Sequence, residues 1–251
     1  MPEPVSPADL AKRAAARRAC EYVQDGMRLG LGTGSTAAWM VRCLGERVAG
    51  EGLRITAVAT STQTAELARA VGIDVVGLDR ADWLDLTIDG ADEVDGALDL
   101  VKGGGGALLR EKIVAAASDR MVVIADASKQ VETLGAFPLP VEVIPFGMTA
   151  TRSLIEEAIA DYDGGGVTVR KDGHAPYVTD EGNHILDLDL RRIGDPRKLT
   201  LTLNQIPGVV ENGLFVEMCD TLVLGHADGR VDVREAAPRR GDENVFADLR
   251  D

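Results

Sequence analysis

Apolar and polar residues follow two alternating periods over the first half of the chain. Short runs of aliphatic residues, such as 53–60, 73–78 and 120–126, have the length and composition of buried strands. The segments between them carry apolar residues at helical spacing, and the first, residues 7–25, follows Ser6, which can cap a helix. Strand and helix alternate in this way through residue 127. The pattern predicts βαβ units and a mainly parallel sheet covered on both faces.

The pattern changes near three closely spaced prolines, Pro138, Pro140 and Pro145, which indicate a hinge or a crossing between two units. Residues 141–205 then have the pattern of a strand, a helix, two or three short strands and a second helix. That order is typical of a small α+β unit of the ferredoxin-like type.

The last part of the chain returns to the first unit. Residues 206–215 lead back to it, and the apolar residues 221–226 predict one more buried strand. The chain after Val233 is polar, so we expect that segment to fray or to pack only partly. We therefore expect two domains and a polar tail. The first domain comprises residues 1–135 and 207–235, the small α+β domain comprises residues 136–206, and the tail comprises residues 236–251.

Charge and composition restrict the partners. The 251 residues suit one α/β domain, alone or with a smaller inserted domain. The net charge of −14 opposes binding to nucleic acid and to anionic membrane surfaces, so we expect neither as a partner. A phosphate-bearing substrate would need a local cluster of donors to overcome that charge.

Cysteines, histidines and hydropathy favour a metal-free cytoplasmic protein. The three cysteines form no CxxC pair, and no two of the three histidines have zinc-ligand spacing. The N-terminal segment lacks the apolar core of a signal peptide, and no apolar stretch approaches the roughly 18 residues of a membrane span. We expect no metal, no cofactor and a reducing compartment.

The first candidate site is a glycine loop at residues 30–37, GLGTGSTA. Glycines let a backbone approach a ligand closely, a helix N-terminus favours an anion, and Thr33, Ser35 and Thr36 add hydroxyl groups. Ser35 or Thr36 also stands where a helix N-cap is expected. The loop is neither a Walker A motif nor a complete dinucleotide fingerprint. A phosphate site and a plain turn with a capped helix are both consistent with it.

Acidic residues crowd a second segment, TIDGADEVD. Asp89 ends an apolar run, where open α/β sheets bind ligands, and we expect it to be functional. Glu93 and Asp95 have the pattern of a solvated acidic turn. Neighbouring carboxylates raise one another's pKa, which suits acid–base chemistry.

The third and fourth segments add cations and a possible base. Lys102 precedes four glycines, 103–106, whose ordering is costly and suggests a loop that wraps a ligand. Glu111 lies about one turn into the next helix. It is consistent with a base beside that loop and with an exposed helix acid. Lys129 follows a buried strand and is expected at the same edge of the sheet.

Together these segments, GTGST, DGADE, KGGGG with REK, and D-x-SK, resemble the ribose-5-phosphate isomerase family of the A type, over residues 8–235. The resemblance implies an α/β fold, a Rossmann-like mainly parallel sheet with a smaller α+β lid domain, and a homo-oligomer, often a dimer. It implies a sugar phosphate as the small-molecule partner. One departure is the fourth glycine, where many relatives have alanine.

The resemblance also implies residue roles in the interconversion of ribose 5-phosphate and ribulose 5-phosphate through an enediolate, in the pentose phosphate pathway. Glu111 would be the general base, with Lys102 and Asp89 beside the reacting carbons and Asp92 in the site wall. The residues expected to hold the phosphate or the sugar are Thr33, Gly34, Ser35, Thr36, Gly90, Ala91, Gly103, Gly104, Gly105, Lys129 and Lys12.

Three alternatives have related folds or chemistry. A non-catalytic sugar-phosphate sensor would keep the glycine loop without needing Glu111 and Lys102 together. A coenzyme A transferase would use a glutamate as a nucleophile and would need a larger pocket. A hexosamine-phosphate isomerase usually relies on a histidine, and none of the three histidines lies near the four segments in sequence.

Overall fold

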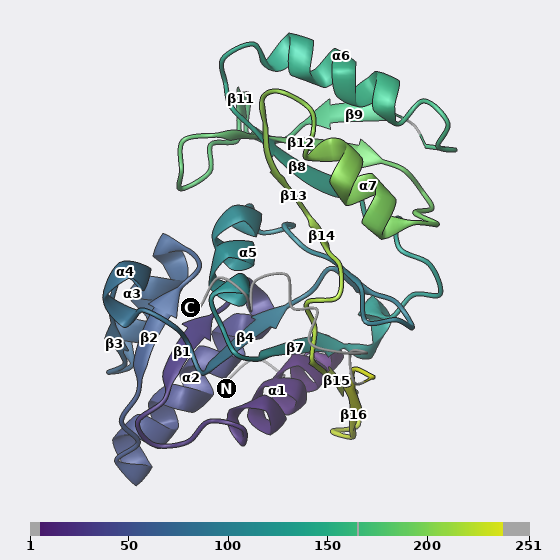
Figure 1. Ribbon diagram of the computed structural model, residues 1–251. Coiled ribbons are helices and arrows are strands. Elements are labelled where there is room, and N and C mark those ends of the chain that lie inside the picture. The colour runs from purple at the N-terminus through teal and green to yellow at the C-terminus, as the bar shows by residue number, and fades with distance from the viewer. Residues whose placement is uncertain (1–5, 165, 238–251) are drawn as a thin grey trace.

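The computed structural model describes residues 6–164 and 166–237, which form two lobes (Figure 1). The lower lobe is built on a seven-stranded sheet in the order β16-β15-β7-β4-β1-β2-β3. All neighbouring strands are parallel except the edge pair of β15 and β16. The strands are β1 (Arg28–Leu31), β2 (Thr56–Ala59), β3 (Asp74–Val75), β4 (Leu86–Gly90), β7 (Met121–Asp126), β15 (Thr221–Gly225) and β16 (Val231–Glu235). The predicted α/β class with a mainly parallel sheet is confirmed.

Helices lie on both faces of this sheet, which explains the uniformly apolar strands. Val122 and Ile124 of β7 pack into the core beneath α1 and α2, whereas Met121, Val123 and Ala125 pack into a second core on the opposite face. A strand buried on both faces shows no alternation of polar residues. The helices are α1 (Pro7–Cys20), α2 (Ser35–Glu51), α3 (Thr62–Ala70), α4 (Leu78–Ala81) and α5 (Leu108–Ala116), with a short 3₁₀ turn, η1 (Ala127–Lys129).

Two predicted elements differ in extent. Ser6 caps α1 by accepting a hydrogen bond from the Asp9 N–H at 3.1 Å, as expected, but the helix ends at Cys20 instead of residue 25. In the apolar segment 73–78 only Asp74 and Val75 form a strand, β3, and Leu78 begins α4. Apolar composition alone did not predict where these elements end.

The upper lobe is a β-α-β-β-α-β unit with all four strands antiparallel, in the order β13-β8-β12-β9 (Figure 1). It has the ferredoxin-like arrangement expected for the small α+β unit. Helices α6 and α7 contribute Ile155, Leu199 and Leu203 to its own apolar core. Its elements are β8 (Leu139–Val143), α6 (Met148–Ala158), β9 (Gly166–Val169), β12 (His184–Asp189), α7 (Pro196–Leu203) and β13 (Val209–Asn212), with a small hairpin of β10 (Lys171–Asp172) and β11 (Ala175–Pro176).

A three-stranded sheet of β5 (Glu93–Val94), β6 (Leu100–Val101) and β14 (Leu214–Phe215) completes the fold. Glu93, expected in a solvated turn, is buried instead: its carboxylate accepts hydrogen bonds from the Gly135 N–H at 2.7 Å and the Phe137 N–H at 2.6 Å. That expectation was wrong because the partners of Glu93 are backbone groups more than forty residues away. Asp95 does lie in a turn, where it accepts from Ala97 N–H at 2.9 Å.

The end of the described chain is more ordered than its polarity suggested. The strand β16 continues past Val233 to Glu235, and the Ala236 N–H donates to the Asp220 carbonyl at 2.8 Å. The remainder of the predicted tail, residues 238–251, lies outside the described residues. Among the residues described, no helix is long and apolar enough to cross a membrane.

Candidate active site

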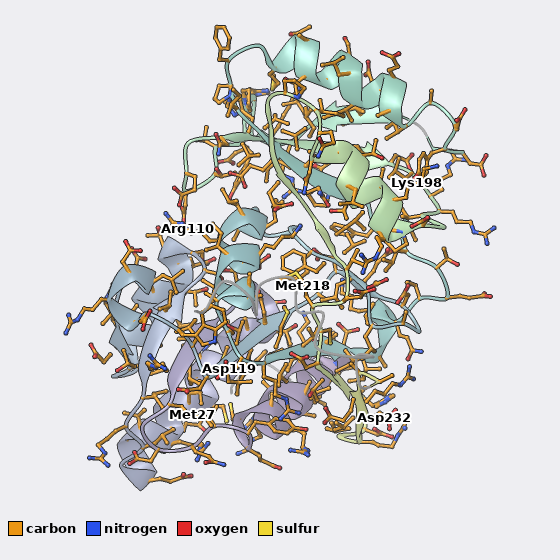
Figure 2. All side chains as sticks on the ribbon, in the orientation of Figure 1. Met27, Arg110, Asp119, Lys198, Met218 and Asp232 are labelled. Carbon is orange, nitrogen blue, oxygen red and sulfur yellow. The ribbon has the colours of Figure 1, made fainter. Side chains whose placement is uncertain are left out.

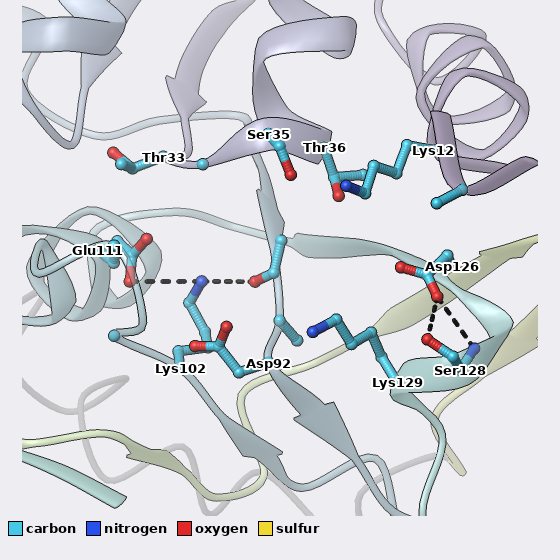
Figure 3. Close-up of a pocket in the computed structure, with 16 residues that line it drawn as sticks. Lys12, Thr33, Ser35, Thr36, Asp92, Lys102, Glu111, Asp126, Ser128 and Lys129 are labelled. Atoms are coloured by element: carbon cyan, nitrogen blue, oxygen red, sulfur yellow. Dashed lines mark hydrogen bonds and ion pairs between the residues drawn. The ribbon is translucent and has the colours of Figure 1, made fainter. Parts of the chain in front are cut away.

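The four predicted loops meet in one pocket of about 310 Å³ at the carboxyl ends of β1, β4 and β7 (Figure 3). Its lining is Ala8, Lys12, Thr33, Gly34, Ser35, Thr36, Gly90, Ala91, Asp92, Lys102, Gly103, Gly105, Glu111, Asp126, Ser128 and Lys129. Of the residues predicted for the site, Asp89 and Gly104 are absent from this lining. Asp126, Ser128 and Ala8 are additional.

Asp89 lies beneath the pocket and is fully buried near the end of β4. Its Oδ1 accepts hydrogen bonds from the Thr33 N–H at 3.1 Å and the Gly90 N–H at 2.7 Å, and its Oδ2 lies 3.0 Å from Lys102 Nζ. Burial raises the pKa of Asp89, and Lys102 partly opposes that rise. A Cβ at Gly32 would come within 1.9 Å of Oδ1, so this glycine leaves the space that the carboxylate occupies.

Lys102, directly after β6, is the central cation of the site. Its Nζ lies 3.4 Å from Glu111 Oε2, donates to the Gly90 carbonyl at 2.5 Å and stands 5.3 Å from the centre of the Phe215 ring. Burial alone would lower the pKa of Lys102, but the charges of Asp89 and Glu111 outweigh burial and raise it. The ammonium therefore stays charged although its side chain is only 2% exposed.

Glu111 lies in the first turn of α5 and projects into the pocket beside Lys102 (Figure 3). The residue is only 4% exposed, which rules out the reading as an exposed helix acid. Burial, reinforced by the charge of Asp89 and opposed by Lys102, raises its pKa to about 8. Apart from the ion pair with Lys102, its Oε2 meets no hydrogen-bond donor within the described chain. A carboxyl group in this state can accept and release a proton near neutral pH.

The glycine loop after Lys102 forms the wall next to Glu111. Gly103 has φ +105° and Gly106 has φ +78°, a backbone conformation that side-chain-bearing residues rarely adopt. The Gly104 N–H donates to Asp92 Oδ2 at 2.7 Å. Gly104 thus contacts Asp92, which lines the pocket, although Gly104 itself does not.

The loop before α2 differs from the prediction in its cap. The N-cap is Gly34, at φ +104°, and no side chain caps the helix, so the expectation of a cap at Ser35 or Thr36 was wrong. Both residues instead line the pocket at the helix N-terminus (Figure 3). Thr33 Oγ1 turns to a cluster of hydroxyls, 2.7 Å from Thr60 Oγ1 and 2.9 Å from Ser61 Oγ.

Two lysines stand at the end of the pocket away from Glu111 (Figure 3). Lys12 comes from α1 and Lys129 from η1, and they flank the N-terminus of α2. Asp126 accepts from the Ser128 N–H at 3.1 Å and shapes the turn that carries Lys129. The polar segment 126–130 was a signal for Asp126 and Ser128, whereas nothing in the sequence pointed to Ala8.

The pocket therefore has two chemically distinct ends. One end joins a carboxyl group of raised pKa to a buried ammonium, which suits proton transfer with stabilisation of an oxyanion. The other combines two lysines with a helix N-terminus, which suits a phosphate group. This local cluster of donors is what an anionic substrate requires in a chain of net charge −14.

The chain is similar to known proteins in both sequence and structure. The family model of ribose 5-phosphate isomerase A (phosphoriboisomerase A) matches residues 56–229. The chain is 68% identical to the ribose-5-phosphate isomerase A of Cereibacter sphaeroides (strain ATCC 17025 / ATH 2.4.3) over 251 residues, 99% of each chain. It is similar to the solved ribose 5-phosphate isomerase A of Methanocaldococcus jannaschii, with TM-score 0.83 and 40% identity over 92% of this chain and 100% of that chain. A D-ribose-5-phosphate isomerase solved in complex with phospho-erythronic acid has TM-score 0.83 and 38% identity over 89% of this chain and 97% of that chain.

Proposed function

We propose that this chain, which belongs to the ribose-5-phosphate isomerase A family, interconverts ribose 5-phosphate and ribulose 5-phosphate through an enediolate in the pentose phosphate pathway. The observation that carries the proposal is the buried Glu111 carboxyl, with a pKa near 8, beside the Lys102 ammonium at 3.4 Å. Family membership supplies the substrate, and the pocket supplies the chemistry that this substrate needs.

Substrate binding begins at the cationic end. Lys12 and Lys129 hold the phosphate with the N–H groups at the start of α2, and the hydroxyls of Ser35 and Thr36 add donors. This anchoring places the carbonyl end of the open-chain sugar at the opposite end, next to Glu111 and Lys102.

Proton transfer follows at that end. In the aldose-to-ketose direction Glu111 removes the proton from C2, and the electron pair moves through the C1–C2 bond onto the carbonyl oxygen to give the enediolate. Lys102 stabilises the developing negative charge, and Glu111 then returns the proton to C1. Asp92, which lines the pocket, contacts the hydroxyl whose proton moves between O2 and O1. Asp89 does not line the pocket, and its Oδ2 lies 3.0 Å from Lys102 Nζ, so we assign it the role of holding that lysine in place.

The sensor alternative is disfavoured by the same residues. A binding module has no need for two buried acids around one buried lysine, because bringing these charges out of water costs stability. Proton transfer gives this arrangement a purpose.

The decisive experiment is an assay of ribose 5-phosphate conversion in EDTA with three proteins: wild type, Glu111→Gln and Glu66→Gln. Glu66 is an exposed glutamate of α3 and serves as the matched control. We expect turnover by wild type and Glu66→Gln, and a loss of several orders of magnitude in kcat with little change in KM for Glu111→Gln. Near-normal turnover by Glu111→Gln would remove Glu111 from the mechanism, and an inactive wild type that binds ribose 5-phosphate would favour the sensor.

We further propose that the two sheets belong to two domains, with the small domain extending to Asn212 because β13 pairs with β8. The separate apolar cores of the lobes support this division. A cytoplasmic homodimer is also proposed, on the strength of family membership and the reduced thiols expected from the sequence.

A further inference from the structure

Arg170 contacts the glycine loop from the other lobe. It follows β9, and its Nη1 donates to the Gly103 carbonyl at 2.7 Å and to the Gly104 carbonyl at 3.2 Å. The Arg170 side chain is only 15% exposed. It thus comes from a segment that the proposed mechanism does not otherwise use.

The position of Arg170 is itself fixed. The carboxylate of Asp187, in β12, accepts hydrogen bonds from Arg170 Nε at 3.0 Å and from Arg170 Nη2 at 2.5 Å. This bidentate pair fixes the orientation of the guanidinium plane. The Arg170 carbonyl also accepts the Tyr177 N–H at 2.9 Å, and the Tyr177 ring lies against Gly106 at the end of the loop. The upper lobe therefore presents a rigid donor to the loop.

Holding these two carbonyls orients two amide groups. In a trans peptide the C=O of one residue and the N–H of the next point in opposite directions, and the described chain contains no cis peptide. The Gly103 carbonyl shares its peptide with the Gly104 N–H, which donates to Asp92. The Gly104 carbonyl shares its peptide with the Gly105 N–H, which is thereby directed away from Arg170.

The Gly105 N–H is available to a substrate oxygen. Gly105 lines the pocket together with Lys102 and Glu111, and no acceptor for its N–H lies among residues 6–164 and 166–237. Four consecutive glycines have a large conformational freedom, so neither amide would keep its direction without an external contact.

We propose that Arg170 is a positioning residue that, through the peptides of Gly103 and Gly104, aims the Gly105 N–H at the enediolate oxygen and fixes Asp92. This inference rests on the proposed isomerase function. The arginine touches no reacting atom, and its effect is exerted on a transition state that needs these donors in place.

The test compares kcat and KM for ribose 5-phosphate in wild type, Arg170→Ala, Arg170→Lys and Arg152→Ala. Arg152 pairs with Glu156 on the outer helix α6 and is the matched control. We expect Arg170→Ala to lower kcat by roughly 100-fold, as a donor misplaced by about 1 Å does, with KM within about threefold of wild type. Arg170→Lys should recover little, because an ammonium cannot hold both the carboxylate and the two carbonyls. Arg152→Ala should match wild type.

Chemical rescue tests whether the guanidinium group itself determines kcat. Methylguanidinium added to Arg170→Ala should raise kcat, and methylammonium should not. If Arg170→Ala fails to fold, Asp187→Asn loosens the guanidinium instead and should lower kcat by roughly tenfold at unchanged KM. An unchanged kcat in these variants, or a rise in KM alone, would overturn the inference about Arg170. The proposed function would still stand in that case, provided that the wild type is active. An inactive wild type would count against the function itself.

Discussion

At the scale of single residues, the site depends on how charge is distributed over three buried groups. The Lys102 ammonium lies 3.0 Å from Asp89 Oδ2 and 3.4 Å from Glu111 Oε2, so one positive charge faces two carboxyl groups that can each carry a negative charge. Asp89 already accepts two N–H hydrogen bonds that stabilise its ionised form. Glu111 has no comparable donors besides Lys102, and burial raises its pKa to about 8.

This distribution predicts the pH dependence of the reaction. A base must be ionised to act, and the pKa of Glu111 in the free protein is raised to about 8. We therefore expect kcat/KM to fall about tenfold per pH unit below that value and to level off above it. Initial rates between pH 6 and 9.5, in buffers of constant ionic strength, provide the measurement. A flat profile across pH 6 to 8 would show that another group takes the proton.

Site residues could be predicted from the sequence where they belong to a local motif. They could not be predicted where their role depends on a partner far away in the sequence. Lys102, Glu111 and the loop hydroxyls belong to compact segments that could be recognised together. Arg170 stands in an ordinary polar hairpin, and its importance arises only when β9 brings it to a loop 66 residues earlier. The same limitation applied to Glu93, whose local surroundings are those of a solvated turn.

At the scale of elements, the loop between β1 and α2 shows how closely backbone and side chains are fitted. Gly32 leaves room for Asp89, with a hypothetical Cβ only 1.9 Å from Oδ1. Gly50, near the end of α2, has nothing within 4 Å of such a Cβ. The two glycines of one βα unit are therefore under different constraints.

Substituting these two glycines separates the constraints. Gly32→Ala should displace Asp89, lower kcat/KM by more than roughly 100-fold and reduce stability, because the clash is with a buried carboxylate. Gly50→Ala should keep activity and add roughly 0.5–1 kcal/mol of stability through helix propensity. Steady-state rates and urea unfolding would test both. Full activity of Gly32→Ala would contradict the tight packing around Asp89.

Strong periodicity predicted most elements, whereas short ones depended on tertiary contacts. The helices α1, α2, α3 and α5 were expected near their observed positions because each has an apolar face next to a turn signal. The strands β5, β6 and β14 have two residues each and exist because they pair with one another across the chain. Such strands carry no period of their own.

At the scale of the whole molecule, the lobes are also joined away from the pocket. Asp180 of the upper lobe accepts hydrogen bonds from the Thr62 N–H at 2.9 Å and its Oγ1 at 3.1 Å, at the start of α3. Arg110 of α5, which Figure 2 places where the lower lobe faces the upper one, lies 3.1 Å from the same carboxylate. The neighbour of the proposed base thus contacts the other lobe.

Removing this contact should loosen the lobes without unfolding them. Asp180→Ala should change the free energy of unfolding by about 1 kcal/mol or less, since the groups are partly exposed. Hydrogen exchange of the Thr62 amide should nevertheless accelerate, because its acceptor is lost. Asp172→Ala, an exposed aspartate in the same hairpin region, is the control. Equal exchange rates at Thr62 in the two variants would argue against a junction at Asp180.

The path of the chain has a consequence for synthesis. Every side chain assigned to substrate contact lies between Lys12 and Lys129, yet β15 (Thr221–Gly225) must still be added beside β7 to complete the parallel sheet. On the ribosome the whole upper lobe therefore emerges, and can fold as a local unit, before the lower lobe closes. The nascent chain carries all its reactive groups for about a hundred residues of elongation while its central sheet lacks a strand, and a contact of such long sequence separation forms slowly. Activity should appear only with the last strands, so an interrupted translation product would remain inert.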